Sequence, residues 1–174
     1  MEKINTLKLL QKFMIFFFVS IILTVAQTLV MTFLSGVVMP GIVTFLFGVI
    51  NFSSYIFIWV SFAKSKDLST RKAYLWLAIL LTVFTIIVNI GVMIAGFIVS
   101  SNALSTGLVS ITMTQEEMTT ILSSLPSFKL INMVSTGVEL ITNVIYLGLG
   151  YFIFTKNKVE LAAAEKEHQE NYGM

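Results

Sequence analysis

Long stretches without a charged side chain alternate along this chain with short clusters of charged residues. The first uncharged stretch runs from Phe13 to Ala63. As one helix it would be roughly 75 Å long at about 1.5 Å per residue, whereas the hydrocarbon core of a bilayer is about 30 Å thick. The stretch therefore predicts two membrane-spanning helices. The turn signals Ser35-Gly36 and Met39-Pro40-Gly41 predict the connection between them.

Two further apolar stretches predict two more spans. One runs from Ala73 to Gln115 without a charge, and the other, from Leu130 to Thr155, is interrupted only by Glu139. The pattern predicts an all-α integral membrane protein with four transmembrane helices in an antiparallel bundle with a polar interior. A single membrane domain is expected over residues 1–174. Its parts are spans at about 13–35, 41–63, 73–99 and 129–154, an outside loop at about 100–128, and a cytoplasmic tail at about 155–174.

The polar residues of each predicted span fall on one face when the helix is drawn at about 100° per residue. The strongest hydrogen-bonding groups also lie near the middle of their spans: Gln27, Asn51, Asn89 and Glu139. Because side-chain amides in hydrocarbon need partners, these groups are expected to turn inward and meet. The predicted intramembrane polar site consists of Glu139, Asn89, Asn143, Asn51, Gln27, Tyr146 and Asn132. The alternative interpretation is a buried polar network that only sets the register of the helices.

Glu139 is the most unusual residue of this set. An acidic side chain at the centre of a helix costs about 2.5–3.5 kcal/mol for membrane insertion. No Lys or Arg lies at the same depth in any predicted span. Glu139 is therefore expected to be protonated at rest or to meet a cation from outside the chain. A carboxylate within a membrane also indicates a functional site.

The outside loop contains the signature of a short helix. Thr114 and Glu117 have the spacing of a capping box, and the apolar residues after them share one face before Pro126. An amphipathic helix is therefore predicted in this loop. It either lies on the bilayer surface or caps the bundle, or it serves as an external docking or gating element. The tail from Lys156 is rich in helix formers and is predicted to extend the fourth helix.

The distribution of charge predicts the orientation of the chain. Of the 11 basic residues, Lys129 alone lies on the side of the outside loop. This asymmetry predicts a multi-pass protein of the cell membrane with both termini in the cytoplasm. Hydrophobic residues make up 56% of the chain and charged residues 11%, whereas an average soluble domain has about 25% charged residues.

The composition leaves few possibilities for chemistry. Cysteine is absent, and the single histidine, His168, lies in the charged tail. The sequence therefore predicts no catalytic residue, no metal site, no cofactor and no nucleic-acid partner, and the protein is expected not to be an enzyme. One hypothesis is a small accessory, immunity-type or partner-binding membrane subunit. The alternative is a small transporter, or a proton- or cation-coupled carrier, that uses Glu139. The lipid bilayer is the expected surrounding, and the partner is left open between another membrane protein and a second copy of the chain.

Overall fold

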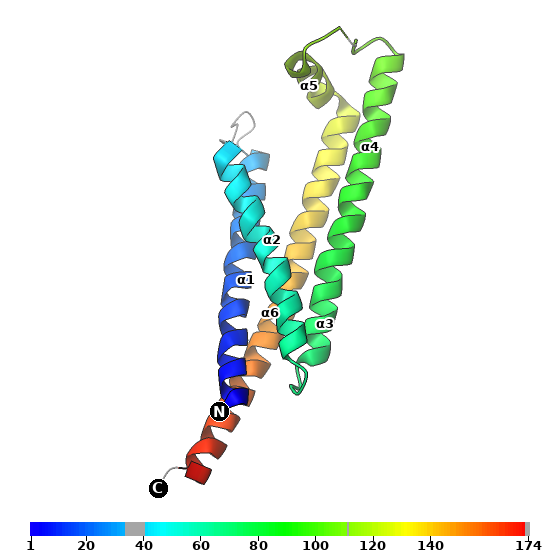
Figure 1. The fold of residues 1–174 in the computed structure, drawn as a ribbon. Helices are drawn as coiled ribbons and strands as arrows, with labels where there is room; N and C mark the ends of the chain where they lie inside the picture. The colour runs from blue at the N-terminus through cyan, green and yellow to red at the C-terminus, as the bar shows by residue number, and fades with distance from the viewer. Residues whose placement is uncertain (34–40, 111, 173–174) are drawn as a thin grey trace. The chain divides into compact units, whose positions relative to one another are not determined.

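The computed structural model describes residues 1–33, 41–110 and 112–172, and within these ranges it contains helices and no strands. The elements are α1 (Glu2–Phe33), α2 (Gly41–Lys64), α3 (Arg71–Ile79), a π-helical segment η1 (Leu80–Phe84), α4 (Thr85–Ser105), α5 (Gln115–Ser124) and α6 (Pro126–Tyr172) (Figure 1). Within these residues, four helical stretches are long and apolar enough to cross a membrane: Glu2–Val30, Phe45–Lys64, Arg71–Ser105 and Pro126–Asn171. The prediction of an all-α chain with four such helices is confirmed.

The helix ends differ from the predicted spans for identifiable reasons. The predicted extension of the fourth helix is confirmed, because α6 continues without a break to Tyr172. The sequence predicted that the loop helix ends before Pro126, and α5 does end at Ser124. Pro126 is also the first residue of α6, whereas the fourth span was expected to begin at about 129. Proline suits that position because its missing N–H would have no helical acceptor there. The predicted turn at Ser35-Gly36 and Met39-Pro40 lies outside the described residues.

The capping box of α5 is present. The backbone N–H of Glu117 donates to Thr114 Oγ1 at 3.3 Å, and the backbone N–H of Thr114 donates to Glu117 Oε2 at 2.9 Å. These bonds satisfy backbone donors at a helix N-terminus, which otherwise lack acceptors. They explain why the helix begins at Gln115. The amphipathic placement of α5 on the membrane surface stays a prediction.

The cap of α5 is expected to depend on pH. Hydrogen bonds from the Thr114 backbone N–H and, second, its hydroxyl hold the pKa of the Glu117 carboxyl below its ordinary value. A lowered pKa means that the cap contributes fully above the ordinary value and is lost as the pH falls through the lowered one. The protection factor of the Glu117 amide, the ratio of its intrinsic to its observed exchange rate, should fall as the pH enters that acidic range. Glu117→Gln should remove the pH dependence, because the amide does not ionise, and a variant whose exchange depends on pH as in the parent would contradict this account.

The chain divides into two compact units. Unit 1 contains Met1–Thr82 and the chain from Thr142 onward, and unit 2 contains Val83–Ile141. In unit 1 the buried positions recur at alternating intervals of three and four residues. They are Leu7, Leu10, Met14, Phe17 and Ile21 on α1, and Asn143, Tyr146, Gly150, Ile153 and Asn157 on α6. This is the heptad spacing of helices that pack knobs into holes, and it explains which face each helix buries.

Gly150 allows α6 to approach α1 closely in unit 1. A Cβ atom at this position would lie 3.0 Å from ring carbons of Phe17 and Phe18 and 3.2 Å from the terminal methyl carbon of Met14. A glycine lets two helix backbones come together where a larger residue would hold them apart. Phe13 of α1 also stacks on Phe57 of α2, with ring centroids 4.7 Å apart. Close van der Waals packing therefore joins α1 to both neighbours, which matters because lipid weakens the hydrophobic driving force between helices.

Unit 2 contains α4, α5 and the first part of α6. Gly107, with φ of 72°, follows the end of α4 in a left-handed conformation that glycine adopts without strain. Large apolar side chains on α4 and on the first part of α6 are exposed, among them Met93, Phe97 and Met133. Such surfaces suit contact with lipid or with another apolar helix.

Candidate functional site

The residues of the predicted polar site are divided between the two units. Gln27, Asn51, Asn143 and Tyr146 belong to unit 1, whereas Asn89, Asn132 and Glu139 belong to unit 2. Each group is therefore described separately. The expected meeting of Glu139 with Asn51 or Gln27 stays a prediction.

Asn51 of α2 bonds to α1. Its Oδ1 accepts hydrogen bonds from Thr24 Oγ1 at 2.8 Å and from Ser20 Oγ at 3.1 Å. Ser20 is buried, and Gln27, two turns further along α1, is half-buried. Hydrogen bonds between membrane helices average about 0.6 kcal/mol and reach about 1.7 kcal/mol. This small cluster thus holds α1 and α2 in register, which is the structural role that the alternative interpretation gives to such polar residues.

Tyr146 joins α6 to the π-helical segment of the third span. Its side chain is buried, and its hydroxyl donates to the backbone carbonyl of Leu80 at 3.0 Å. Leu80 is the first residue of η1. Single π-helical turns inside helices are rare and are often found at functional sites. The sequence carried no signal for η1, because its residues, Leu80-Leu81-Thr82-Val83-Phe84, are ordinary for a membrane helix.

Asn143 is the one buried side chain in the described residues with a polar atom left without a hydrogen bond. It lies one turn before Tyr146 on α6 and is 5% exposed, and its Nδ2 has no partner. A buried donor without an acceptor costs about 1–3 kcal/mol. The amide could therefore donate to a carbonyl, a carboxylate or a water molecule that enters this position.

The polar residues of unit 2 differ from those of unit 1 in their exposure. Asn89 of α4 and Asn132 of α6 are exposed, and Glu139 of α6 is half-buried. The Asn89 Nδ2 atom donates to the carbonyl of Thr85 in its own helix at 2.9 Å. That bond uses one of the two amide N–H groups and leaves the carbonyl oxygen of the side chain available. Asn89 therefore presents hydrogen-bonding capacity at the middle of a membrane-spanning stretch.

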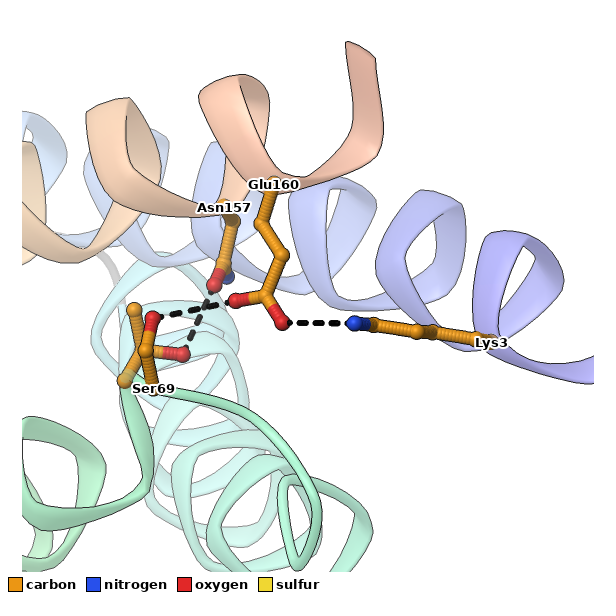
Figure 2. A network of polar contacts seen from close by, with 5 residues as sticks. Lys3, Ser69, Asn157 and Glu160 are labelled. Atoms are coloured by element: carbon orange, nitrogen blue, oxygen red, sulfur yellow. Dashed lines mark hydrogen bonds and ion pairs between the residues drawn. The ribbon is translucent and has the colours of Figure 1, made fainter. Parts of the chain in front are cut away.

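Sequence reasoning missed a buried polar network in unit 1, where the loop between α2 and α3 meets α6. Thr70 Oγ1 donates to Asn157 Oδ1 at 2.8 Å (Figure 2), and Asn157 Nδ2 donates to the hydroxyl of Tyr74 at 2.7 Å. All three side chains are buried. The sequence did not indicate this site, because Asn157 lies between Lys156 and Lys158, a pattern that predicts a solvated tail. Its place in the heptad that begins at Asn143 was the available signal.

Ion pairs extend this network outward. Glu160 accepts a hydrogen bond from Ser69 Oγ at 3.0 Å and forms an ion pair with Lys3 Nζ at 3.1 Å (Figure 2). Lys8 Nζ lies 2.9 Å from Glu165 Oε1, beside an open groove of about 390 Å³ between the start of α1 and the last turns of α6. Exposed pairs contribute little individually, so the buried amide of Asn157 carries most of the stabilisation here.

The comparisons with known proteins identify no relative: no family model, no curated protein and no solved structure matches the chain. Within the described residues, no group of three His, Cys, Asp or Glu side chains lies close enough to hold a metal ion. The polar groups of this part of the chain can donate and accept hydrogen bonds, and Glu139 can carry a proton.

Proposed function

We propose that the protein is a small, non-enzymatic subunit of the cell membrane that binds another membrane protein, as an accessory or immunity-type protein does. The exposure of Asn89 in the third membrane-spanning stretch is the observation that carries this proposal. An amide that faces hydrocarbon is costly, and a neighbouring protein can lower that cost by bonding to it.

The polar groups of unit 1 support the same function indirectly. Asn51, Tyr146 and Asn157 each form a hydrogen bond to another segment of the same chain. These bonds explain the three polar side chains as structural contacts, so a substrate-binding role is not needed to explain them. Asn89, by contrast, bonds only to its own helix among the contacts described. The side of α4 that carries Asn89 and Met93 therefore suits contact with a second helix.

Photo-crosslinking in intact membranes tests this proposal. A photoreactive amino acid at Met93, one turn from Asn89 and 74% exposed, is expected to capture one discrete second protein. The same group at Ile22, an exposed position on α1, serves as the control and should capture only lipid. Asn89→Leu should abolish the product at Met93, whereas Asn102→Leu, at an exposed position of the same helix, should leave it. Lipid adducts alone at both positions would refute the proposal.

The orientation belongs to the same proposal. Ten of the 11 basic residues lie toward the two ends of the chain or in the stretch from the end of α2 to the start of α3, which favours cytoplasmic termini. A cysteine at Ser105 should then react with an impermeant thiol reagent in whole cells, and a cysteine at Lys66 should not. Labelling at Lys66 from outside would reverse the orientation.

A proton- or cation-coupled carrier is the second candidate, and the unpartnered amide of Asn143 favours it. Asn143 lies in unit 1, where its buried Nδ2 could donate to an oxygen of a substrate. Glu139, in unit 2, is the intramembrane carboxylate that a coupled carrier would use. Glu139→Gln mimics the protonated carboxyl and separates the two functions. In proteoliposomes, a carrier should lose its proton or cation flux in this variant. A partner-binding subunit should show no flux dependent on Glu139.

A further inference from the structure

Six exposed basic side chains lie on the segments that meet where the loop between α2 and α3 contacts α6, and we call this set the loop-end basic surface. Its members, all exposed, are Lys64, Lys66, Arg71, Lys72, Lys156 and Lys158. Four come from the end of α2, the loop and the start of α3, and two come from α6. Segments far apart in the sequence, all within unit 1, therefore contribute to this set.

Hydrogen bonds hold these segments together. Thr70 in the loop bonds to the buried Asn157 of α6, and Ser69 bonds to Glu160 one turn further on (Figure 2). The loop is also closed by backbone bonds, from Leu68 N–H to the Ser65 carbonyl and from Arg71 N–H to the Leu68 carbonyl. The two groups of basic residues are thus positioned before any ligand arrives, which reduces the entropy lost on binding.

The positive charge of this surface is poorly compensated by the chain. Among the described residues, none of its six members forms an ion pair with a carboxylate. Glu160, the acidic residue nearest to Lys158 along α6, pairs with Lys3 instead. Asp67 is the only acidic residue of the loop. An anion that approaches the surface therefore meets an excess of positive charge.

Aromatic side chains place this surface at the depth of lipid headgroups. Trp59 precedes Lys64 and Trp76 follows Lys72 by little more than a helical turn, and both are exposed. The Arg71 guanidinium carbon lies 5.7 Å from the centroid of the Phe62 ring, and Lys156 Nζ lies 5.9 Å from that of Phe152. Exposed tryptophans mark the membrane–water interface, and basic residues just beyond them reach the phosphates.

From these observations we infer that the loop-end basic surface binds the phosphate headgroups of anionic phospholipids. Clusters of four to eight basic residues beside a membrane-spanning helix attract such lipids electrostatically. Lipid is favoured over an acidic protein because exposed aromatic and apolar side chains flank the basic residues, where acyl chains continue from each headgroup. This lipid site does not depend on the accessory role proposed above.

Lipid binding in mixed micelles of a neutral detergent provides the test. Fluorescent phosphatidylglycerol serves as the probe, and phosphatidylcholine with the same label serves as the neutral comparison. The double variant Lys66→Gln/Lys158→Gln is expected to weaken phosphatidylglycerol binding about 25-fold, at about fivefold for each basic side chain. The matched control Lys129→Gln/Lys166→Gln changes the net charge equally and should weaken it less than about twofold by the same electrostatic reasoning.

The hydrogen bonds of the loop supply a second arm of the test. Thr70→Val keeps every basic residue but removes the bond to Asn157, and it should weaken binding several-fold while the far-ultraviolet circular dichroism is unchanged. Equal losses in the two double variants, or equal affinity for phosphatidylcholine, would overturn the lipid site. Displacement by millimolar inorganic phosphate would reassign the surface to free anions. If polyglutamate displaced the fluorescent lipid at a lower concentration than unlabelled phosphatidylglycerol does, the surface would be reassigned to an acidic protein.

Discussion

Replacing Asn157 by leucine is expected to lower the free energy of unfolding by about 3 kcal/mol. The substitution removes the bonds that Asn157 forms with Thr70 and Tyr74 and leaves both hydroxyl groups buried among apolar atoms. Each lost bond costs about 1 kcal/mol, and each stranded hydroxyl adds to the loss. Reversible unfolding in mixed micelles with increasing sodium dodecyl sulfate would measure the difference.

The same substitution at an exposed site of the same helix provides the control. Asn171→Leu should change the stability by less than about 0.5 kcal/mol, as surface substitutions usually do. Thr70→Val removes only one of the two bonds of Asn157 and should cost about 1 kcal/mol. If Asn157→Leu were as stable as the parent, the network between the loop and α6 would not hold unit 1 together.

Gly150→Leu is the second substitution with a large expected effect. A Cβ at this position already meets the rings of Phe17 and Phe18 at 3.0 Å, so a leucine side chain would push α6 away from α1. Overpacking of a close helix contact costs about 1–3 kcal/mol, and more when the neighbours cannot move. Phe17 is fully buried, so the upper part of that range is expected.

Gly148 offers a matched comparison two residues away on the same helix. A Cβ at Gly148 would meet nothing within 4 Å. Gly148→Leu should therefore be neutral or slightly stabilising, because leucine has a higher helix propensity than glycine. Similar melting temperatures for the two variants in detergent would show that α1 and α6 do not approach each other at Gly150.

The sequence predicted the helices well because their signals are local. Long uncharged stretches, a capping box at Thr114 and Glu117, and helix formers after Lys156 each depend on neighbours in the chain. The sequence predicted the end of the loop helix before Pro126 but placed the start of the fourth helix at about 129, because proline can both follow one helix and begin another. No local rule separates the two, and the choice depended on how α5 ends at Leu125.

The candidate polar residues were harder to predict because their roles depend on packing. The helical wheel placed Asn51 and Tyr146 on polar faces, but it could not show that their partners are a pair of hydroxyls and a backbone carbonyl. Asn157 was overlooked because flanking lysines masked its place in the heptad. Asn89 had the same sequence signal as Asn51, and only the structure distinguishes its exposure.

The most direct test of the proposed function is a mass measurement. The protein is extracted with its surrounding lipids into polymer-bounded native nanodiscs, without detergent, and the mass of the particle is determined. The chain has a mass of 19.4 kDa. Native mass spectrometry is expected to show it bound to a second, different polypeptide in the parent and in Asn102→Leu, and alone with lipid in Asn89→Leu. A parent particle that holds only this chain, with the same mass as the Asn89→Leu particle, would contradict the account.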